Sequence, residues 1–182
     1  MTETPSEAQD VLAFWRDAGP KKWFAKDSAF DIAFRDRFAL LYSCASRGEL
    51  KHWRATAEGA LAEILLLDQF PRNAFRNTPW AFATDPLALE AAKAMHAAGL
   101  DQSLPPELRA FAYMPFDHSE ALEDQNLAVE LLSPLSEENA YHAVEHRKLI
   151  ERFGRFPHRN AILGRASTDE EIRFLAEGGY RP

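Results

Sequence analysis

The sequence is poor in β-branched apolar residues. Its 182 residues include 3 valines and 5 isoleucines, against 30 alanines and 21 leucines. β-Branched side chains suit a pleated sheet, whereas alanine and leucine lose little conformational freedom in a helix. The shortage argues against a fold built on β-sheets and favours an all-α protein. A hydrophobic share of 46% excludes a disordered tail or a collagen-like fibre and suffices for a sizeable core.

Cysteines and long apolar runs are also missing. The single Cys44 excludes a disulfide scaffold and fits a reducing compartment. It lies within an apolar helical pattern, so we expect its thiol to be buried and inert. The most apolar stretch, residues 60–67, contains Glu63 and is far shorter than the roughly 18 residues of a membrane span. With no signal-peptide pattern at the start, the sequence predicts a cytoplasmic protein that does not bind membranes. At roughly 150 residues per domain, we expect one all-helical domain over residues 1–182.

Charge is unevenly distributed along the chain. The formal net charge of −7 disfavours binding to nucleic-acid phosphates. Residues 116–138 contain seven acidic residues and no Lys or Arg, whereas residues 146–165 contain six basic residues and one Glu. The basic stretch is where we expect an anionic partner.

Prolines, glycines and capping residues mark eight or nine expected helices. Their short links favour antiparallel helical hairpins packed in layers. The expected ranges are about 5–18, 27–48, 56–70, 85–99, 105–114, 119–132, 136–153, 160–163 and 168–178.

Several helix boundaries rest on single residues. Pro71 is expected to end the buried, almost wholly apolar helix before it, and another helix is expected to end before Pro115. Ser119 is expected to cap the helix that follows. Residues 4–7 read as a capping box, and residues 167–171 read as two overlapping capping boxes.

The acidic and basic stretches fall on two consecutive expected helices. A hairpin with its turn near Pro134 predicts three facing pairs, which are Glu123 with His146, Glu120 with Leu149, and Asp117 with Arg152. One interpretation is a solvated ion-pair face that adds little stability. The other is a functional polar cluster of His118, Glu120, Glu123, His146 and Arg152.

One short sequence occurs twice in similar form. Residues 69–74 read Gln-Phe-Pro-Arg-Asn-Ala, and residues 155–161 read Arg-Phe-Pro-His-Arg-Asn-Ala. A structural interpretation is that Phe anchors the helix exit, Pro ends the helix, and Arg or Asn satisfies free carbonyls. Alternatively, the two stretches supply two guanidinium–amide pairs that line a ligand site. Asp68 precedes the first stretch and needs a partner if buried, and Arg72 is the nearest candidate.

Histidines offer two further hypotheses. His142 and His146 form an H-x-x-E-H pattern, which is typical of some zinc hydrolases. Such a site also needs a third protein ligand and a large surrounding domain, and only 36 residues follow His146, so we predict no metal site. At a predicted helix start, Ser119 caps and Glu120 complements the helix dipole, which leaves His118 free as an acid or base.

Several blocks of the sequence resemble a bacterial family of unknown function, the domain-of-unknown-function family numbered nine hundred and twenty-four. The blocks comprise residues 23–24, 26–27, 30–31, 65–73, 81–85, 113–116, 118–120, 153–160 and 163–165. The resemblance implies an all-helical, tetratricopeptide-like fold and supplies no activity, substrate or cofactor. It also implies that the polar residues in these blocks belong to the family pattern, namely Asp68, Gln69, Arg72, Asn73, His118, Glu120, Arg155, His158, Arg159 and Asn160.

Three functional hypotheses follow. The first is a cofactor-free binding module for an anionic small molecule or an acidic peptide terminus. Its Arg72, Arg155 and Arg159 would pair with the anion and its Asn73 and Asn160 would add amide contacts. The second is a small-molecule hydrolase or transferase. In that enzyme, His118 or His158 would act as a base beside Glu120 or Asp68. The third is a structural helical protein that self-associates as a homo-oligomer.

Overall fold

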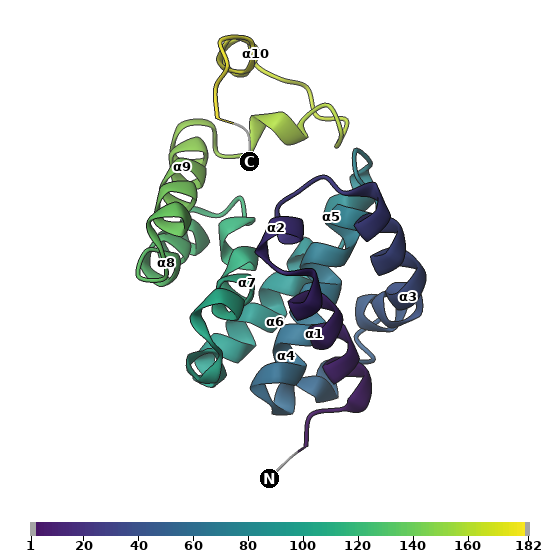
Figure 1. Ribbon diagram of the computed structural model, residues 1–182. Helices are drawn as coiled ribbons and strands as arrows, with labels where there is room; N and C mark the ends of the chain where they lie inside the picture. Colours follow the sequence, from purple (N-terminus) through teal and green to yellow (C-terminus); the bar gives the residue numbers. More distant parts are fainter. Residues whose placement is uncertain (1–2, 181–182) are drawn as a thin grey trace.

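The computed structural model describes residues 3–180, which form helices and no strands (Figure 1). The α-helices are α1 (Ser6–Ala18), α2 (Pro20–Trp23), α3 (Ser28–Ser46), α4 (Ala57–Ile64), α5 (Phe70–Ala74), α6 (Asp85–Ala97), α7 (Pro106–Asp117), α8 (Leu122–Leu132), α9 (Glu137–Phe153) and α10 (Asp169–Ala176). Short 3₁₀ helices η1 (Lys51–Ala55), η3 (Pro79–Phe82), η4 (Leu100–Ser103) and η5 (Pro157–Arg159) join some of them. A π-helical turn η2 (Leu65–Gln69) joins α4 to α5. Because these three segments run on without a break, residues 3–180 contain nine α-helical rods. The all-α, tetratricopeptide-like architecture of antiparallel hairpins is confirmed.

The continuous helix formed by α4, η2 and α5, called the central rod, passes through Pro71. The expected helix end before that residue is therefore wrong. Proline has no N–H for the carbonyl four residues earlier and its ring crowds that carbonyl. In the π turn, the Phe70 amide bonds to the carbonyl five residues earlier, that of Leu65. The carbonyl four residues before Pro71 is that of Leu67, and it accepts from the Thr84 hydroxyl at 2.5 Å. The widened turn and an outside donor therefore let the helix continue past a proline.

Other boundaries also differ from expectation. Helix α7 runs two residues beyond Pro115, and the His118 amide closes it by bonding to the Met114 carbonyl at 2.9 Å. Ser119 does not cap α8. Its hydroxyl donates to Asp124 at 2.7 Å and organises the link between the helices.

The expected capping boxes had different outcomes. At residues 4–7 none forms, because α1 has no side-chain cap at its first turn. Of the two overlapping boxes expected at α10, the one between Thr168 and Glu171 is present, and these residues bond reciprocally to each other's backbone.

The main core is built around the central rod. Every residue of α4 and η2 from 59 to 69 is buried, which confirms the expected helix that is apolar almost all round. Trp15 of α1 packs edge-on against Phe111 of α7 with ring centroids 5.1 Å apart. A smaller cluster of Leu149, Ile150 and Phe156 is separate from this core. This smaller cluster packs the C-terminal segment, residues 154–180, against α9, whereas hydrogen bonds join the segment to Glu120 and His118.

Helices α8 and α9 form the expected hairpin with a different pairing. Asp117 pairs with His146 at 2.6 Å, whereas Arg152 pairs with Glu170 of α10. Glu120 pairs with Arg165, beyond α9. The expected pairing is wrong because residues 117–121 belong to the end of α7 and its link to α8.

Candidate functional site

The π turn places a carboxylate in the interior. Asp68 is 1% exposed, and Gln69 Nε2 donates to its Oδ2 at 2.7 Å. Burial by itself raises the pKa of Asp68. The charges of Arg72 and His118 and the hydrogen bonds from His118 and Gln69 outweigh burial and lower the pKa well below its usual range. Asp68 is therefore ionised at neutral pH. π turns inside helices occur frequently at functional sites.

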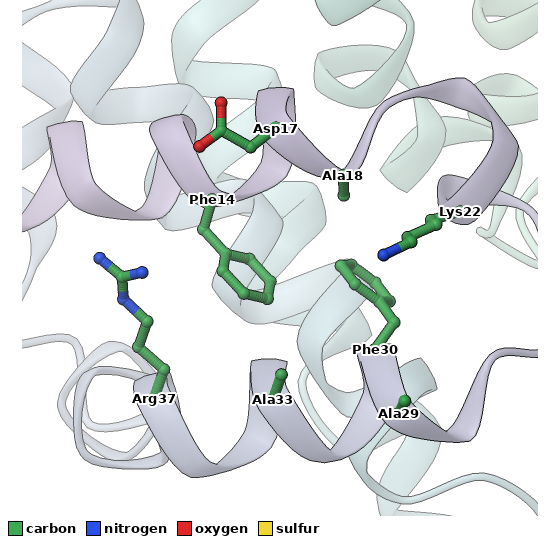
Figure 2. Close-up of a pocket in the computed structure, with 8 residues that line it drawn as sticks. All are labelled: Phe14, Asp17, Ala18, Lys22, Ala29, Phe30, Ala33 and Arg37. Carbon is green, nitrogen blue, oxygen red and sulfur yellow. The ribbon is translucent and has the colours of Figure 1, made fainter.

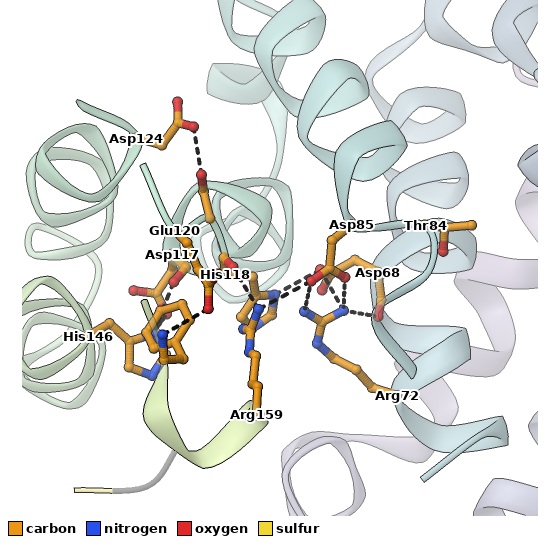
Figure 3. A network of polar contacts seen from close by, with 12 residues as sticks. Asp68, Arg72, Thr84, Asp85, Asp117, His118, Glu120, Asp124, His146 and Arg159 are labelled. Carbon is orange, nitrogen blue, oxygen red and sulfur yellow. Dashed lines mark hydrogen bonds and ion pairs between the residues drawn. The ribbon is translucent and has the colours of Figure 1, made fainter. Parts of the chain in front are cut away.

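His118, the C-cap residue of α7, meets this carboxylate (Figure 3). Its Nδ1 lies 2.8 Å from Asp68 Oδ1. An ionised carboxylate can only accept, so Nδ1 carries a proton and donates it to Asp68. No described residue bonds to Nε2, and that atom is not enclosed. This is the arrangement in which a carboxylate orients an imidazole for proton transfer.

Arg72 and Asp85 lie next to the Asp68–His118 pair. These four residues form one cluster with Arg159, Phe82 and Asp117. The two Arg72 terminal nitrogens donate to the two Asp85 oxygens at 2.8 and 3.0 Å, the bidentate geometry of a strong pair. Arg72 Nη1 also donates to the Asp68 carbonyl at 2.8 Å and lies 3.1 Å from its carboxylate. Asp85 begins α6, where a negative charge also suits the helix dipole.

Arg159 approaches the same carboxylate from η5. Its guanidinium carbon lies 4.8 Å from the Phe82 ring centre and 4.4 Å from that of Phe156. Its Nη1 donates to the His118 carbonyl at 3.1 Å and reaches Asp85 Oδ2 at 3.5 Å. The side chain is 7% exposed, and its Nε is buried with no hydrogen-bond partner among the described residues. Arg159 therefore keeps unused donor capacity.

The surroundings of Arg159 are electrostatically unfavourable for a cation. Burial, followed by the nearby charge of Arg72, lowers the pKa of Arg159 to about 10. Asp85 opposes this effect but shares its charge between two guanidiniums. An additional negative group beside Arg159 would relieve both the repulsion and the unpartnered Nε.

The expected guanidinium–amide pairs are only half brought together. Arg72 and Arg159 converge, but Asn73 bonds to the Gln69 carbonyl at 2.8 Å. Asn160 bonds to Ser167 and Glu171. Asn73 thus satisfies a helix carbonyl, as the structural interpretation of the repeated sequence predicted, whereas Asn160 donates to two side chains.

Arg155 and Glu120, which were expected to bind a ligand or to assist a base, form contacts that hold the C-terminal segment. Arg155 pairs with Glu171 at 2.7 Å. Glu120 accepts from Arg165 at 2.7 and 3.0 Å and from the Phe156 amide at 2.8 Å. Their contacts fix η5 against α10 and the α7–α8 link, which positions Arg159.

Two more histidines lie on the Phe156 side. His146 is buried against Asp117, 6.5 Å from the His118 ring centre. Burial and the charge of Arg159 lower the pKa of His158 to about 4, so His158 is neutral near pH 7 and a weak base. Its Nδ1 and the Nε2 of His146 are buried without partners among residues 3–180.

The sequence analysis did not predict three members of the cluster as site residues, namely Phe82, Asp85 and Asp117. Asp85 and Phe82 fall in the resembling block at residues 81–85, but Asp85 was interpreted only as a helix start. Asp117 was given a different partner. The sequence signal for Asp85 was its position at a predicted helix start, in the same short block as the aromatic Phe82.

The cluster reaches solvent along one edge. Side-chain exposure is 15% for His118, 17% for Arg72 and 19% for Asp85. A separate hollow of about 290 Å³ lies between α1 and α3, with Phe14 and Phe30 as its apolar lining and Arg37 near one end (Figure 2). That hollow contains none of the cluster residues.

The remaining candidates take no part in the cluster. His142 Nδ1 contacts the Tyr180 hydroxyl at 2.5 Å. Over residues 3–180 no three His, Cys, Asp or Glu side chains are grouped so that they could hold a metal ion. Cys44 is half-buried rather than buried, with Arg47 Nη2 3.6 Å from its sulfur. Within the same range, no helix has the length and apolar character required to cross a bilayer.

The fold and the cluster together define an all-α protein with a charged, histidine-containing layer between its main core and its C-terminal segment. The chain matches the model of the bacterial protein family of unknown function DUF924 over residues 11–179, and it belongs to that family. It is also similar to the solved structure of ATU0120, a protein of unknown function from Agrobacterium tumefaciens, with 50% identity and a TM-score of 0.94. The match covers 97% of this chain and 100% of that one. The comparison with curated proteins finds no match.

Proposed function

We propose that the Arg72–Arg159 cluster binds a small ligand through a carboxylate or phosphate group. The observation that carries the proposal is the buried Arg159 guanidinium, which lies beside a second guanidinium and has an unpartnered Nε. Guanidinium groups bind carboxylate and phosphate oxygens in pairs of hydrogen bonds. The partly exposed edge at Arg72, Asp85 and His118 supplies a route from solvent. A peptide terminus carries the same carboxylate chemistry.

The test measures thermal stabilisation by sulfate, inorganic phosphate and succinate at matched ionic strength, with sodium chloride as the reference salt. A ligand that binds only the folded state raises the melting temperature. We expect the tetrahedral anions or succinate to raise it in the native protein. The increase should disappear in Arg159→Gln and in Arg72→Gln.

Arg152→Gln is the matched control. It removes an arginine of the same basic stretch that forms an exposed pair with Glu170, outside the cluster. This variant should gain as much from the anion as the native protein gains. Equal gains in Arg159→Gln, or equal stabilisation by chloride, would refute the binding site.

A second candidate function rests on the Asp68–His118 pair. The 2.8 Å contact and the open Nε2 support a hydrolase or transferase in which His118 is the base. Hydrolysis of 4-nitrophenyl phosphate and 4-nitrophenyl acetate by the native protein, lost in His118→Gln with sulfate binding retained, would support it. Hydrolysis at the same rate in His118→Gln would exclude it. The self-associating structural role stays a prediction, which sedimentation of the native protein would test.

A further inference from the structure

The carboxylates of the cluster already offset its guanidiniums before any ligand arrives. Asp68, Asp85 and Asp117 contribute three negative charges, and Arg72 and Arg159 contribute two positive charges. Each guanidinium already contacts a carboxylate. A buried anion added to this group would therefore be a net uncompensated charge, which a low-dielectric site disfavours.

His118 is the titratable member of the cluster with an open nitrogen. Its Nδ1 proton is directed to Asp68, and in the neutral imidazole the open Nε2 accepts one more proton. Histidine is the side chain whose ordinary titration range includes neutral pH. Asp68 would then face an imidazolium at 2.8 Å, a favourable charge pair.

We propose that His118 takes up a proton at Nε2 when an anion binds at the Arg72–Arg159 cluster. This inference rests on the proposed function. The anion comes from solution with its charge, and one proton comes from solution to the lone pair of His118. No bond of the ligand forms or breaks, and the added positive charge offsets one negative charge of the bound anion. The ligand class is therefore one that stays ionised at neutral pH and benefits from a cationic imidazole.

The groups facing His118 come from all the elements packed around it. They are Asp68 and Arg72 from η2 and α5, Asp85 from α6, Arg159 from η5, His146 from α9 and the adjacent Asp117 of α7. His146 is the only other histidine within this group. Its Nδ1 pairs with Asp117 and its Nε2 is enclosed, so His118 is the one with access to an arriving proton.

The experiment is calorimetric titration of the full chain with sulfate, in buffers whose ionisation enthalpies differ. Sulfate keeps both negative charges throughout the histidine range, so any proton taken up goes to the protein. We expect proton uptake on sulfate binding by the native protein. The affinity should also rise as the pH falls, by up to about tenfold per pH unit for one linked proton.

Two variants and one spectroscopic signal locate the proton. In His118→Gln the proton uptake and the pH dependence should vanish, whereas His142→Gln, which changes a histidine outside the cluster, should retain both. In the native protein, sulfate should move the His118 ring nitrogen resonances to those of an imidazolium, a readout that needs no variant. Sulfate binding with no proton uptake, or uptake that persists in His118→Gln, overturns this inference and leaves the proposed function standing. The absence of any binding of sulfate, phosphate or succinate refutes the proposed function itself.

Discussion

Arg72 and Arg159 meet at a single carboxylate, that of Asp85. Asp85 lies 13 residues after the first arginine and 74 residues before the second. The two arginines come from the two similar stretches of sequence, and both guanidiniums lie against the Phe82 ring, at 5.8 and 4.8 Å. Two positive groups are thus held close together by one shared negative group and one aromatic ring.

Asp85→Asn should lower stability and strengthen anion binding. The variant leaves two neighbouring guanidiniums without their shared carboxylate, which should reduce the free energy of unfolding by about 2 kcal/mol. The same vacancy should make sulfate raise the melting temperature more than it does in the native protein. Urea unfolding with and without sulfate measures both effects. Asp36→Asn, which removes an exposed pair with Arg35, should change stability by less than about 0.5 kcal/mol. A destabilised Asp85→Asn that gains nothing from sulfate would mean that the arginines are purely structural.

Glu171 should hold the C-terminal segment far more strongly than its neighbour Glu170. Glu171 is 2% exposed, closes the capping box of α10 and pairs with Arg155. Glu171→Gln should cost about 2 kcal/mol. Glu170 forms an exposed pair with Arg152, so Glu170→Gln should cost less than about 0.5 kcal/mol. Urea unfolding compares the two, and hydrogen exchange in α10 localises the effect. Equal costs would contradict the structure at α10.

The same residue should make stability fall in acid. The hydrogen bond from Arg155, ahead of all other causes, lowers the pKa of Glu171 from 4.5 to about 2. The unfolded chain therefore binds this proton at a higher pH than the folded chain does. Its contribution is complete above pH 4.5 and is lost as the pH falls toward 2. The stability difference between the native protein and Glu171→Gln should shrink across that interval, and a difference that stays constant would contradict the assignment.

Thr84→Val should destabilise the central rod. The Thr84 hydroxyl is the donor to the Leu67 carbonyl, which the proline at position 71 leaves without an amide. Valine keeps the shape but leaves a buried carbonyl unpartnered, at a cost of about 1–3 kcal/mol. Thr78→Val is the control, because the Thr78 hydroxyl bonds locally to the Phe75 carbonyl in a half-buried turn. Urea unfolding should rank Thr84→Val as the more damaging change, and the reverse order would refute this account of the π turn.

His158 should stay neutral well below the usual histidine range. Burial, followed by the charge of Arg159, lowers the pKa of His158 from 6.5 to about 4. Between these values the unfolded chain binds a proton that the folded chain does not, so stability should fall as the pH drops from 6.5 to 4. His158→Gln should remove this part of the pH dependence. A nuclear magnetic resonance titration of His158 with a midpoint near 6.5 would show that its ring is solvated.

Local sequence determined the secondary-structure class and many helix boundaries. Few β-branched residues and abundant alanine and leucine favour helices at every position, because the preference acts residue by residue. The caps at Asp27 and Thr56 and the capping box at α10 are also local, since each bonds within three residues. Family membership could be predicted for the same reason, from blocks of contiguous residues.

Only the tertiary structure decided that the helix continues past Pro71 and which polar side chains contact one another. The donor that lets the rod continue is Thr84, which the sequence pattern does not connect to Leu67. Arg72 and Arg159 stand in similar stretches, as do Asn73 and Asn160, yet only the arginines reach a common partner. A long guanidinium can bridge two packed segments, whereas the short asparagine amides are taken up by their nearest backbone and side-chain groups. The sequence therefore determined an all-α member of its family, and side-chain reach across the packed helices decided where its candidate site lies.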